Sequence, residues 1–152
     1  MPIMINQKQI KLCKIDRNAA IPTYATKASA GADLYALCKE PVTVNPGRTE
    51  LIHTGIALEI PEGFAGFIYA RSGLATKHGI APANKVGVID ADYRGEIMVS
   101  LYNQSDKPYT IENGERIAQM VIAPYLKAEF CVCEELESTQ RGHGGFGSTG
   151  TK

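Results

Sequence analysis

Short runs of alternating apolar and polar residues recur along almost the whole chain, and helical periodicity is nearly absent. Turn residues separate these runs at intervals of about 8–12 residues, a spacing typical of antiparallel sandwiches and barrels. The runs are QIKLCKI, RTELIHTGIALEI (interrupted by Gly55), GFAGFIYA, KVGVID, GEIMVSLYN, RIAQMVIAPYL and EFCVCEEL. We therefore predict one all-β domain.

Three segments depart from this pattern. RSGLATKHG, residues 71–79, predicts one short helix, with Ser72 as its cap and Gly79 as its end. Residues 16–30 predict a long surface loop. RGHGGFGSTG, residues 141–150, has the glycine-rich composition of a flexible terminus, but it also carries a cation, an aromatic ring and two hydroxyls.

Composition excludes several broad classes of function. The 152 residues hold 16 Lys and Arg against 16 Asp and Glu, so no overall positive field favours nucleic acid or an anionic membrane. The beginning of the sequence lacks a signal-peptide pattern, and no apolar run approaches the ~18 residues of a membrane helix. The four cysteines form no CxxC pair. We expect free thiols in a reducing, cytoplasmic compartment.

A few residues have no evident packing reason in a β domain. Arg71, Ser72 and Gly73 open the predicted helix and could bind a phosphate there. VGVIDADYRGEI predicts a hairpin with Asp90 and Asp92 near its turn. A capped helix start and a solvated acidic turn are the alternative explanations of these two stretches.

Several common chemistries do not fit the sequence. It contains no GxxxxGK[ST] phosphate loop, and Ser148 lacks the glycine two residues earlier that a nucleophile elbow requires. The histidines, His53, His78 and His143, are scattered without metal-ligand spacing. No protein-built metal site is therefore predicted.

Five motifs taken together are more specific. AGADLYA (30–36), RSGLA (71–75), GVIDADYRGEI (87–97), GERIAQ (114–119) and RGHGGFGSTG (141–150) occur in this order. With them the chain resembles the trimeric deoxyuridine triphosphate nucleotidohydrolases (dUTPases) over essentially its whole length. The resemblance implies a jelly-roll-like β barrel or sandwich in residues 1–140, with a flexible lid in residues 141–152. It also implies a homotrimer whose three active sites draw on more than one subunit. Ala70 is a departure, since the family often has proline there.

The resemblance further implies hydrolysis of dUTP to dUMP and pyrophosphate, which supplies dUMP for thymidylate synthesis and keeps uracil out of DNA. Asp90 would orient and deprotonate the attacking water. Mg²⁺ would be held by the substrate phosphates and water, with Asp33 at most in its outer coordination sphere. No nucleic acid or membrane partner is implied.

Binding roles follow from the same resemblance. Arg71, Ser72, Gly73 and Gln119 would hold the phosphates. Asn84 and the backbone of Gly87 and Val88 would read the uracil edge. Ile89 and Asp90 would line the sugar, and Tyr93 would exclude a 2′-hydroxyl. Met98 would either touch the substrate or pack in the core. In the lid, Phe146 would stack on uracil, while Arg141, Gly147, Ser148 and Thr149 would bind the outer phosphates.

Other functions remain open at this stage. A dCTP deaminase, alone or combined with a diphosphatase, shares the fold but needs a glutamate near the cytosine amine, whereas VGVIDADY supplies an aspartate and a tyrosine. A non-catalytic module could keep the nucleotide pocket and use dUTP as a signal. A purely structural trimer would give the glycine-rich tail no purpose.

Overall fold

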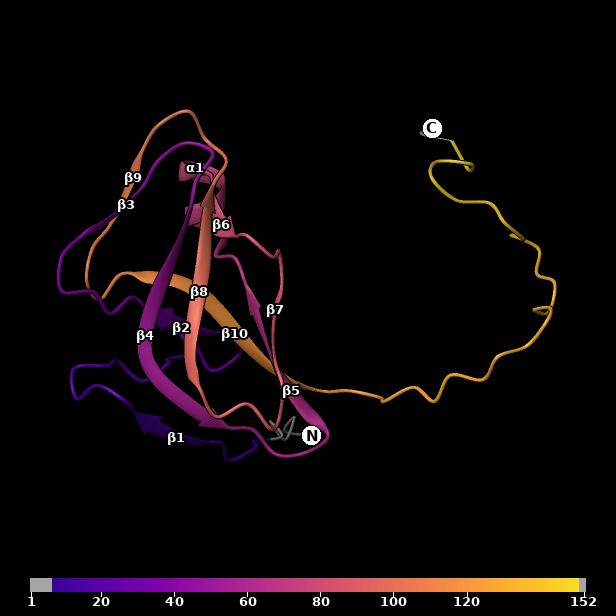
Figure 1. Cartoon of the computed structure of the whole chain (residues 1–152), viewed down its shortest axis with the longest axis horizontal. Helices are drawn as coiled ribbons and strands as arrows, with labels where there is room; N and C mark the ends of the chain where they lie inside the picture. The colour runs from indigo at the N-terminus through magenta and orange to yellow at the C-terminus, as the bar shows by residue number, and fades with distance from the viewer. Residues whose placement is uncertain (1–6, 151–152) are drawn as a thin grey trace.

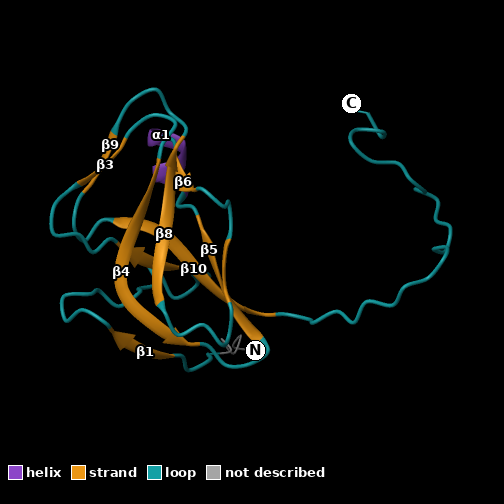
Figure 2. Ribbon diagram, viewed as in Figure 1, coloured by secondary structure: helices purple, strands orange, loops and turns teal. Residues whose placement is uncertain are grey.

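The computed structural model describes residues 7–150. Residues 1–6 of the predicted β domain and residues 151–152 of the predicted lid lie outside the described residues. Within them the chain forms ten strands and one short helix (Figures 1 and 2). The elements are β1 Lys11–Lys14, β2 Ala32–Tyr35, β3 Val42–Val44, β4 Thr49–Glu59, β5 Phe64–Tyr69, α1 Ser72–His78, β6 Ile80–Pro82, β7 Gly87–Ile89, β8 Glu96–Asn103, β9 Tyr109–Ile111 and β10 Arg116–Pro124. No helix of this part of the chain is long and apolar enough to cross a membrane.

The strands form two four-stranded antiparallel sheets and one two-stranded ribbon. One sheet has the order β1-β4-β8-β6, the other has the order β2-β10-β5-β7, and β3 pairs with β9 in the ribbon. The prediction of an all-β fold with one short helix is confirmed. The sheets do not close into one continuous barrel, so the sandwich describes the architecture better than the barrel does.

The core lies between the two four-stranded sheets. In β8, Ile97, Val99 and Leu101 are buried, while the residues between them are only half-buried, as the two-residue period of a strand requires. Leu34 and Ile117 of the second sheet belong to the same buried cluster. One apolar core therefore fixes the positions of the loops that leave both sheets.

Gly55 does not end a strand. It lies inside β4 with φ +70°, and the pairing of β4 with β8 shifts register between His53 and Ala57. A left-handed φ costs glycine little, so β4 continues through the irregularity.

The predicted hairpin around residues 87–97 is wrong. β7 pairs with β5 in one sheet, whereas β8 pairs with β4 and β6 in the other. Residues 90–95 therefore connect the two sheets and are not the turn of a hairpin. Alternation shows that two runs are strands but does not show which strands they pair with.

The helix is confirmed, but its predicted cap is wrong. Arg71 occupies the N-cap position without a side-chain capping bond, and Ser72 is already the first helical residue. Gly79 ends the helix as predicted, with φ +68° and its N–H donated to the carbonyl of Ala75.

Beyond β10 the chain leaves the sandwich as an extended tail (Figure 1). The prediction of a strand in EFCVCEEL is wrong for this structure, because no strand is formed there and no neighbouring strand pairs with it. Phe130 and Val132 are more than nine-tenths exposed. The tail contributes nothing to the apolar core of the described residues.

Candidate active site

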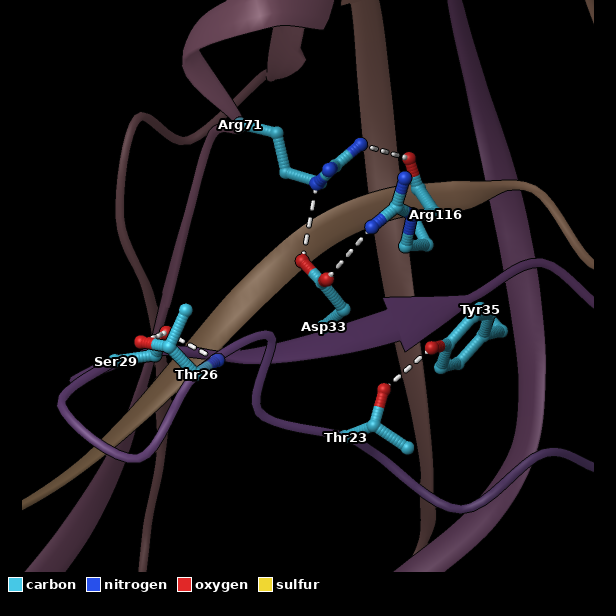
Figure 3. A network of polar contacts seen from close by, with 7 residues as sticks. All are labelled: Thr23, Thr26, Ser29, Asp33, Tyr35, Arg71 and Arg116. Atoms are coloured by element: carbon cyan, nitrogen blue, oxygen red, sulfur yellow. Dashed lines mark hydrogen bonds and ion pairs between the residues drawn. The ribbon is translucent and has the colours of Figure 1, made fainter.

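Asp33 is the centre of a polar network at one end of the sheet β2-β10-β5-β7, where Arg71 at the start of α1 and Arg116 of β10 meet it (Figure 3). It lies in β2, opposite Gln119 of β10, and only 8% of it is exposed. Its Oδ1 accepts a hydrogen bond from Arg71 Nε at 3.0 Å, and its Oδ2 lies 3.5 Å from Arg116 Nη1. A buried carboxylate is stable only when such charged partners are present. Asp33 therefore holds two guanidinium groups side by side.

The two arginines open onto a cavity of about 420 Å³, which we call the arginine pocket. Its walls come from the loop before β2, the end of β5, the start of α1 and β10. They include Ser29, Gly31, Asp33, Tyr69, Arg71, Ser72, Gly73, Arg116 and Gln119. The polar side chains here are two guanidinium groups, one amide, three hydroxyls and one carboxylate, and the carboxylate is already engaged. Such a pocket suits an anion with several oxygens.

Gln119 owes its position to a glycine. Its Nε2 donates to the carbonyl of Ala70 at 2.9 Å, which ties β10 to the end of β5. A Cβ on Gly31 would lie 2.4 Å from Gln119 Oε1, closer than real Cβ contacts allow. Gly31 therefore leaves the space that the amide occupies at the pocket wall.

Asp90 lies in a different cavity. A cavity of about 740 Å³, here called the aspartate pocket, is lined by Asp90, Asp92, Arg94, Lys11, Glu59, Glu62, Tyr125 and Lys127 among others. It shares no lining residue with the arginine pocket. The Asp90 side chain is exposed to solvent at this cavity. Within one chain, the structure does not bring Asp90 into the arginine pocket.

Tyr93 is held in place by its neighbours. Its hydroxyl donates to the carbonyl of Glu96 at 2.8 Å, and the ring lies so close to Gly95 that a Cβ there would be 2.5 Å from the hydroxyl oxygen. Burial acts to raise the pKa of the Glu96 carboxyl. The hydrogen bonds from His53 and from the Gly55 N–H outweigh it, so the pKa of Glu96 is lowered. The start of β8 is therefore held by hydrogen bonds to the Glu96 carbonyl from Tyr93 and to the Glu96 carboxylate from His53 and Gly55.

The residues predicted to read uracil lie at the edge of the second sheet. Asn84 precedes β7 in an exposed turn, where its carbonyl accepts the N–H of Val86 at 2.8 Å. Gly87 and Ile89 are half-buried through pairing with β5, and Val88 is 56% exposed. Pairing with β5 therefore fixes the position of β7, while the Val88 side chain stays accessible to solvent.

Met98 is not a core residue. It lies on the outer face of β8, opposite His53, and lines neither the arginine pocket nor the aspartate pocket. The alternative that Met98 packs in the core is therefore wrong, whereas its contact with a substrate stays a prediction.

The predicted lid residues lie in the tail, away from the sandwich (Figure 1). Arg141 Nε donates to the carbonyl of Gly144, and the N–H of Ser148 donates to the carbonyl of Gly145, so the segment folds into successive turns. Phe146 is fully exposed with φ +49°, and Gly147 has φ +88°. Among the described residues, no hydrogen bond joins these turns to either pocket. Gly147 and Thr149 are exposed to solvent as well.

The donor set of the arginine pocket is made for anions rather than for a cation. Both oxygens of Asp33 face guanidinium groups, and residues 7–150 contain no group of three or more His, Cys, Asp or Glu side chains placed to hold a metal. A metal ion bound here would have to bring its other ligands with the substrate.

Arg116 is a charged residue of the arginine pocket that sequence reasoning did not select. It belongs to GERIAQ, three residues before Gln119, and is the first residue of β10. A charged residue at the start of a strand usually needs no explanation, so the pattern alone gave no reason to select it. Its contact with Asp33, 83 residues away in the chain, supplies that reason.

Comparisons with known proteins agree on one family. A family model described as dUTPase matches residues 17–150. The deoxyuridine 5'-triphosphate nucleotidohydrolase of Desulfitobacterium hafniense (strain DSM 10664 / DCB-2) is 47% identical over 149 residues, covering 96% of this chain and 99% of that protein. The protein of the same name from Glaesserella parasuis serovar 5 (strain SH0165) is 50% identical over 148 residues, covering 94% and 98%. Among solved structures, the Staphylococcus bacteriophage 80alpha dUTPase with dUpNHpp matches with a TM-score of 0.85 at 31% identity, covering 95% and 100%.

Proposed function

Because this chain belongs to the dUTPase family, we propose that it hydrolyses dUTP to dUMP and pyrophosphate by attack of an Asp90-held water on the α-phosphorus. The chain is an enzyme of the dUTP diphosphatase class. The observation that carries the proposal for the site is the arginine pocket, where one buried carboxylate presents two guanidinium groups beside Gln119.

The triphosphate binds in the arginine pocket. Arg71 carries a positive charge that Asp33 holds in one orientation, and Ser72 and Gly73 line the same wall. Ser72 hydrogen-bonds the bridging oxygen on which negative charge develops as the bond breaks. Because the groups are preset by the fold, little reorganisation is needed when the substrate arrives.

Asp90 accepts a proton from the attacking water. The new bond joins the water oxygen to the α-phosphorus, and the bond from that phosphorus to the oxygen bridging to the β-phosphate breaks. The bridging oxygen leaves with pyrophosphate. Mg²⁺ brought in with the substrate would neutralise the charge that develops on the leaving group.

A complete site requires more than one copy of the chain. The separation of the aspartate pocket from the arginine pocket supports this, as does a tail that extends away from both. In the homotrimer we propose, one subunit gives Asp90 and the uracil-reading edge of β7, and another gives the arginine pocket. A lid of residues 141–152 closes over both.

Subunit mixing tests this arrangement. Asp90→Asn and Arg71→Ala chains, each inactive alone, should regain about a quarter of wild-type activity when co-expressed in equal amounts, since a quarter of sites would combine two intact halves. The double variant Asp90→Asn/Arg71→Ala, co-expressed with either single variant, is the control and should stay inactive. If the two single variants stay inactive together although mass spectrometry shows mixed trimers, Asp90 and Arg71 serve one site from the same chain.

The sugar filter depends on Tyr93. Its ring, held against Gly95 and bonded to the Glu96 carbonyl, lies against the deoxyribose and leaves no room for a 2′-hydroxyl. Asn84 and the β7 backbone pair with the uracil edge, and Ile89 lines the sugar.

Tyr93→Ala should admit UTP. We expect the ratio of kcat/KM for dUTP over UTP to fall by roughly 10-fold or more, because the ring that excludes the hydroxyl is gone. Tyr93→Phe keeps the ring and loses only the bond to Glu96, so it should retain most of the selectivity. Equal selectivity in wild type and Tyr93→Ala would remove Tyr93 from the sugar filter.

The direct test is pyrophosphate and ammonia release by the purified protein with Mg²⁺, across dUTP, dCTP, dTTP and UTP. Pyrophosphate from dUTP alone is the expected result, and it would fit an enzyme that supplies dUMP and keeps uracil out of DNA. Ammonia from dCTP would indicate the deaminase instead. Binding of dUTP without turnover would indicate the dUTP-sensing module.

A further inference from the structure

We propose that His53 is a positioning residue for the sugar filter: through Glu96 it fixes the Tyr93 ring and so helps to set the preference for dUTP over UTP. His53 lines neither the arginine pocket nor the aspartate pocket, so it acts only through its neighbours. The inference rests on the proposed function and deepens it, because none of the site roles derived from the sequence includes His53.

The pairing of β4 with β8 is irregular beside the start of β8. His53 pairs with Met98 and Ala57 pairs with Glu96, so β4 takes four steps along the chain where β8 takes two. The extra residues of β4 cannot all pair with backbone groups of β8. Irregularities of this kind often lie beside active sites, where they redirect a side chain. Bonds other than the regular ladder therefore have to hold the first residues of β8.

Side chains supply these bonds. One carboxylate oxygen of Glu96 accepts the Gly55 N–H at 2.8 Å, and the other lies 2.9 Å from His53 Nδ1. The buried Thr54 hydroxyl donates to the carbonyl of Ile97. Burial favours the neutral carboxyl of Glu96, but the bonds from His53 and Gly55 outweigh it and lower the pKa, so the acceptor stays ionised. Three successive residues of β4 thus hold the first two residues of β8.

The position of Glu96 determines that of Tyr93. The Glu96 main-chain carbonyl accepts the Tyr93 hydroxyl at 2.8 Å, and this is the only hydrogen bond of the Tyr93 side chain among the described residues. The rest of the connection from β7 to β8 is hydrogen-bonded only to itself within the described part of the chain. The place of the ring therefore depends on where β8 begins, and the contact of His53 with Glu96 helps to fix that point.

His53 is better placed to fix this local position than to stabilise the whole fold. Its side chain is 56% exposed, and exposed ion pairs add little to overall stability. Glu96 is only 20% exposed and has a second anchor in the Gly55 N–H. Loss of His53 would therefore loosen the start of β8 and leave the buried core in place.

His53→Ala should lower the ratio of kcat/KM for dUTP over UTP by about 3- to 10-fold, because a small shift of a positioning ring weakens discrimination. The melting temperature should fall by no more than about 2 °C. His53→Asn places an N–H donor near the position of Nδ1 and should recover most of the ratio. Thr49→Ala is the matched control and should leave the ratio unchanged. Thr49 is exposed on the same face of β4, and its side chain makes no hydrogen bond among the described residues.

The Tyr93→Ala background shows whether His53 acts through the ring. In that background, His53→Ala should change the ratio by less than about 2-fold, because the group that His53 positions is already gone. An equal effect of His53→Ala with and without the Tyr93 ring would overturn the proposal.

Fluorine NMR of protein labelled with 3-fluorotyrosine keeps this test separate from the proposed function. His53→Ala should shift or broaden the Tyr93 signal, assigned with Tyr93→Phe, in protein without nucleotide, and Thr49→Ala should not. If the signal responds while Tyr93→Ala keeps its sugar selectivity, the sugar filter is refuted but the positioning of the ring by His53 is supported. An unchanged signal, or an unchanged ratio in His53→Ala while Tyr93→Ala loses selectivity, would overturn the proposal. A melting temperature that falls steeply in both His53 variants would show that His53 only supports the fold.

Discussion

Asp90→Asn should bind dUTP normally and lose turnover, with kcat lower by on the order of 10²- to 10⁴-fold. Asparagine has nearly the shape of aspartate but cannot accept a proton from water. The local backbone should survive the change, because the Tyr93 N–H bonds to the main-chain carbonyl of residue 90 and not to its side chain. The exposed carboxylate has no ion-pair partner among the described residues, so its removal leaves no buried charge behind.

Single-turnover kinetics and equilibrium binding of dUTP would separate the two effects. Asp92→Asn is the matched control, since Asp92 lies two residues away in the same aspartate pocket. It should change kcat by only a few fold. A near-normal kcat in Asp90→Asn, or an equal loss in both variants, would remove Asp90 from the role of general base.

A chain ending at residue 140 should fold and assemble but lose most of its activity. The tail adds no residue to the buried core, so the melting temperature should stay within a degree or two. In the proposed site, Arg141, Phe146 and Ser148 cover the phosphates and the uracil ring, and the truncated chain would lack all three. Two or more charge-assisted hydrogen bonds disappear, which corresponds to a loss of roughly 100-fold in kcat/KM.

The truncated chain should be compared with full-length protein in steady-state kinetics, thermal melting and sedimentation. Arg141→Ala and Phe146→Ala in the full-length chain would divide the loss between the phosphate contact and the ring contact. Full activity in the chain ending at 140 would show that the tail is not a lid. An unfolded or monomeric product would show that it supports the assembly.

The local patterns predicted most of the strands correctly, because alternation of apolar and polar residues directly reflects which face of a strand is buried. They gave no run for β2, β3, β6 and β9, which hold only three or four residues each and show little alternation. They also predicted a hairpin at residues 87–97, where the chain crosses from one sheet to the other. Alternation contains no information about the partner strand.

Local sequence patterns were enough to predict an all-β domain, one short helix ending at Gly79, and the five motifs with their order. Each of these depends on residues near one another in the chain. The folded structure was needed to show that Arg71 and Arg116, 38 and 83 residues from Asp33, meet on its carboxylate. It also decided that Asp90 faces another pocket. Such contacts depend on which strands pair and on the burial of one charge, and both are settled only when the two sheets close over a common core.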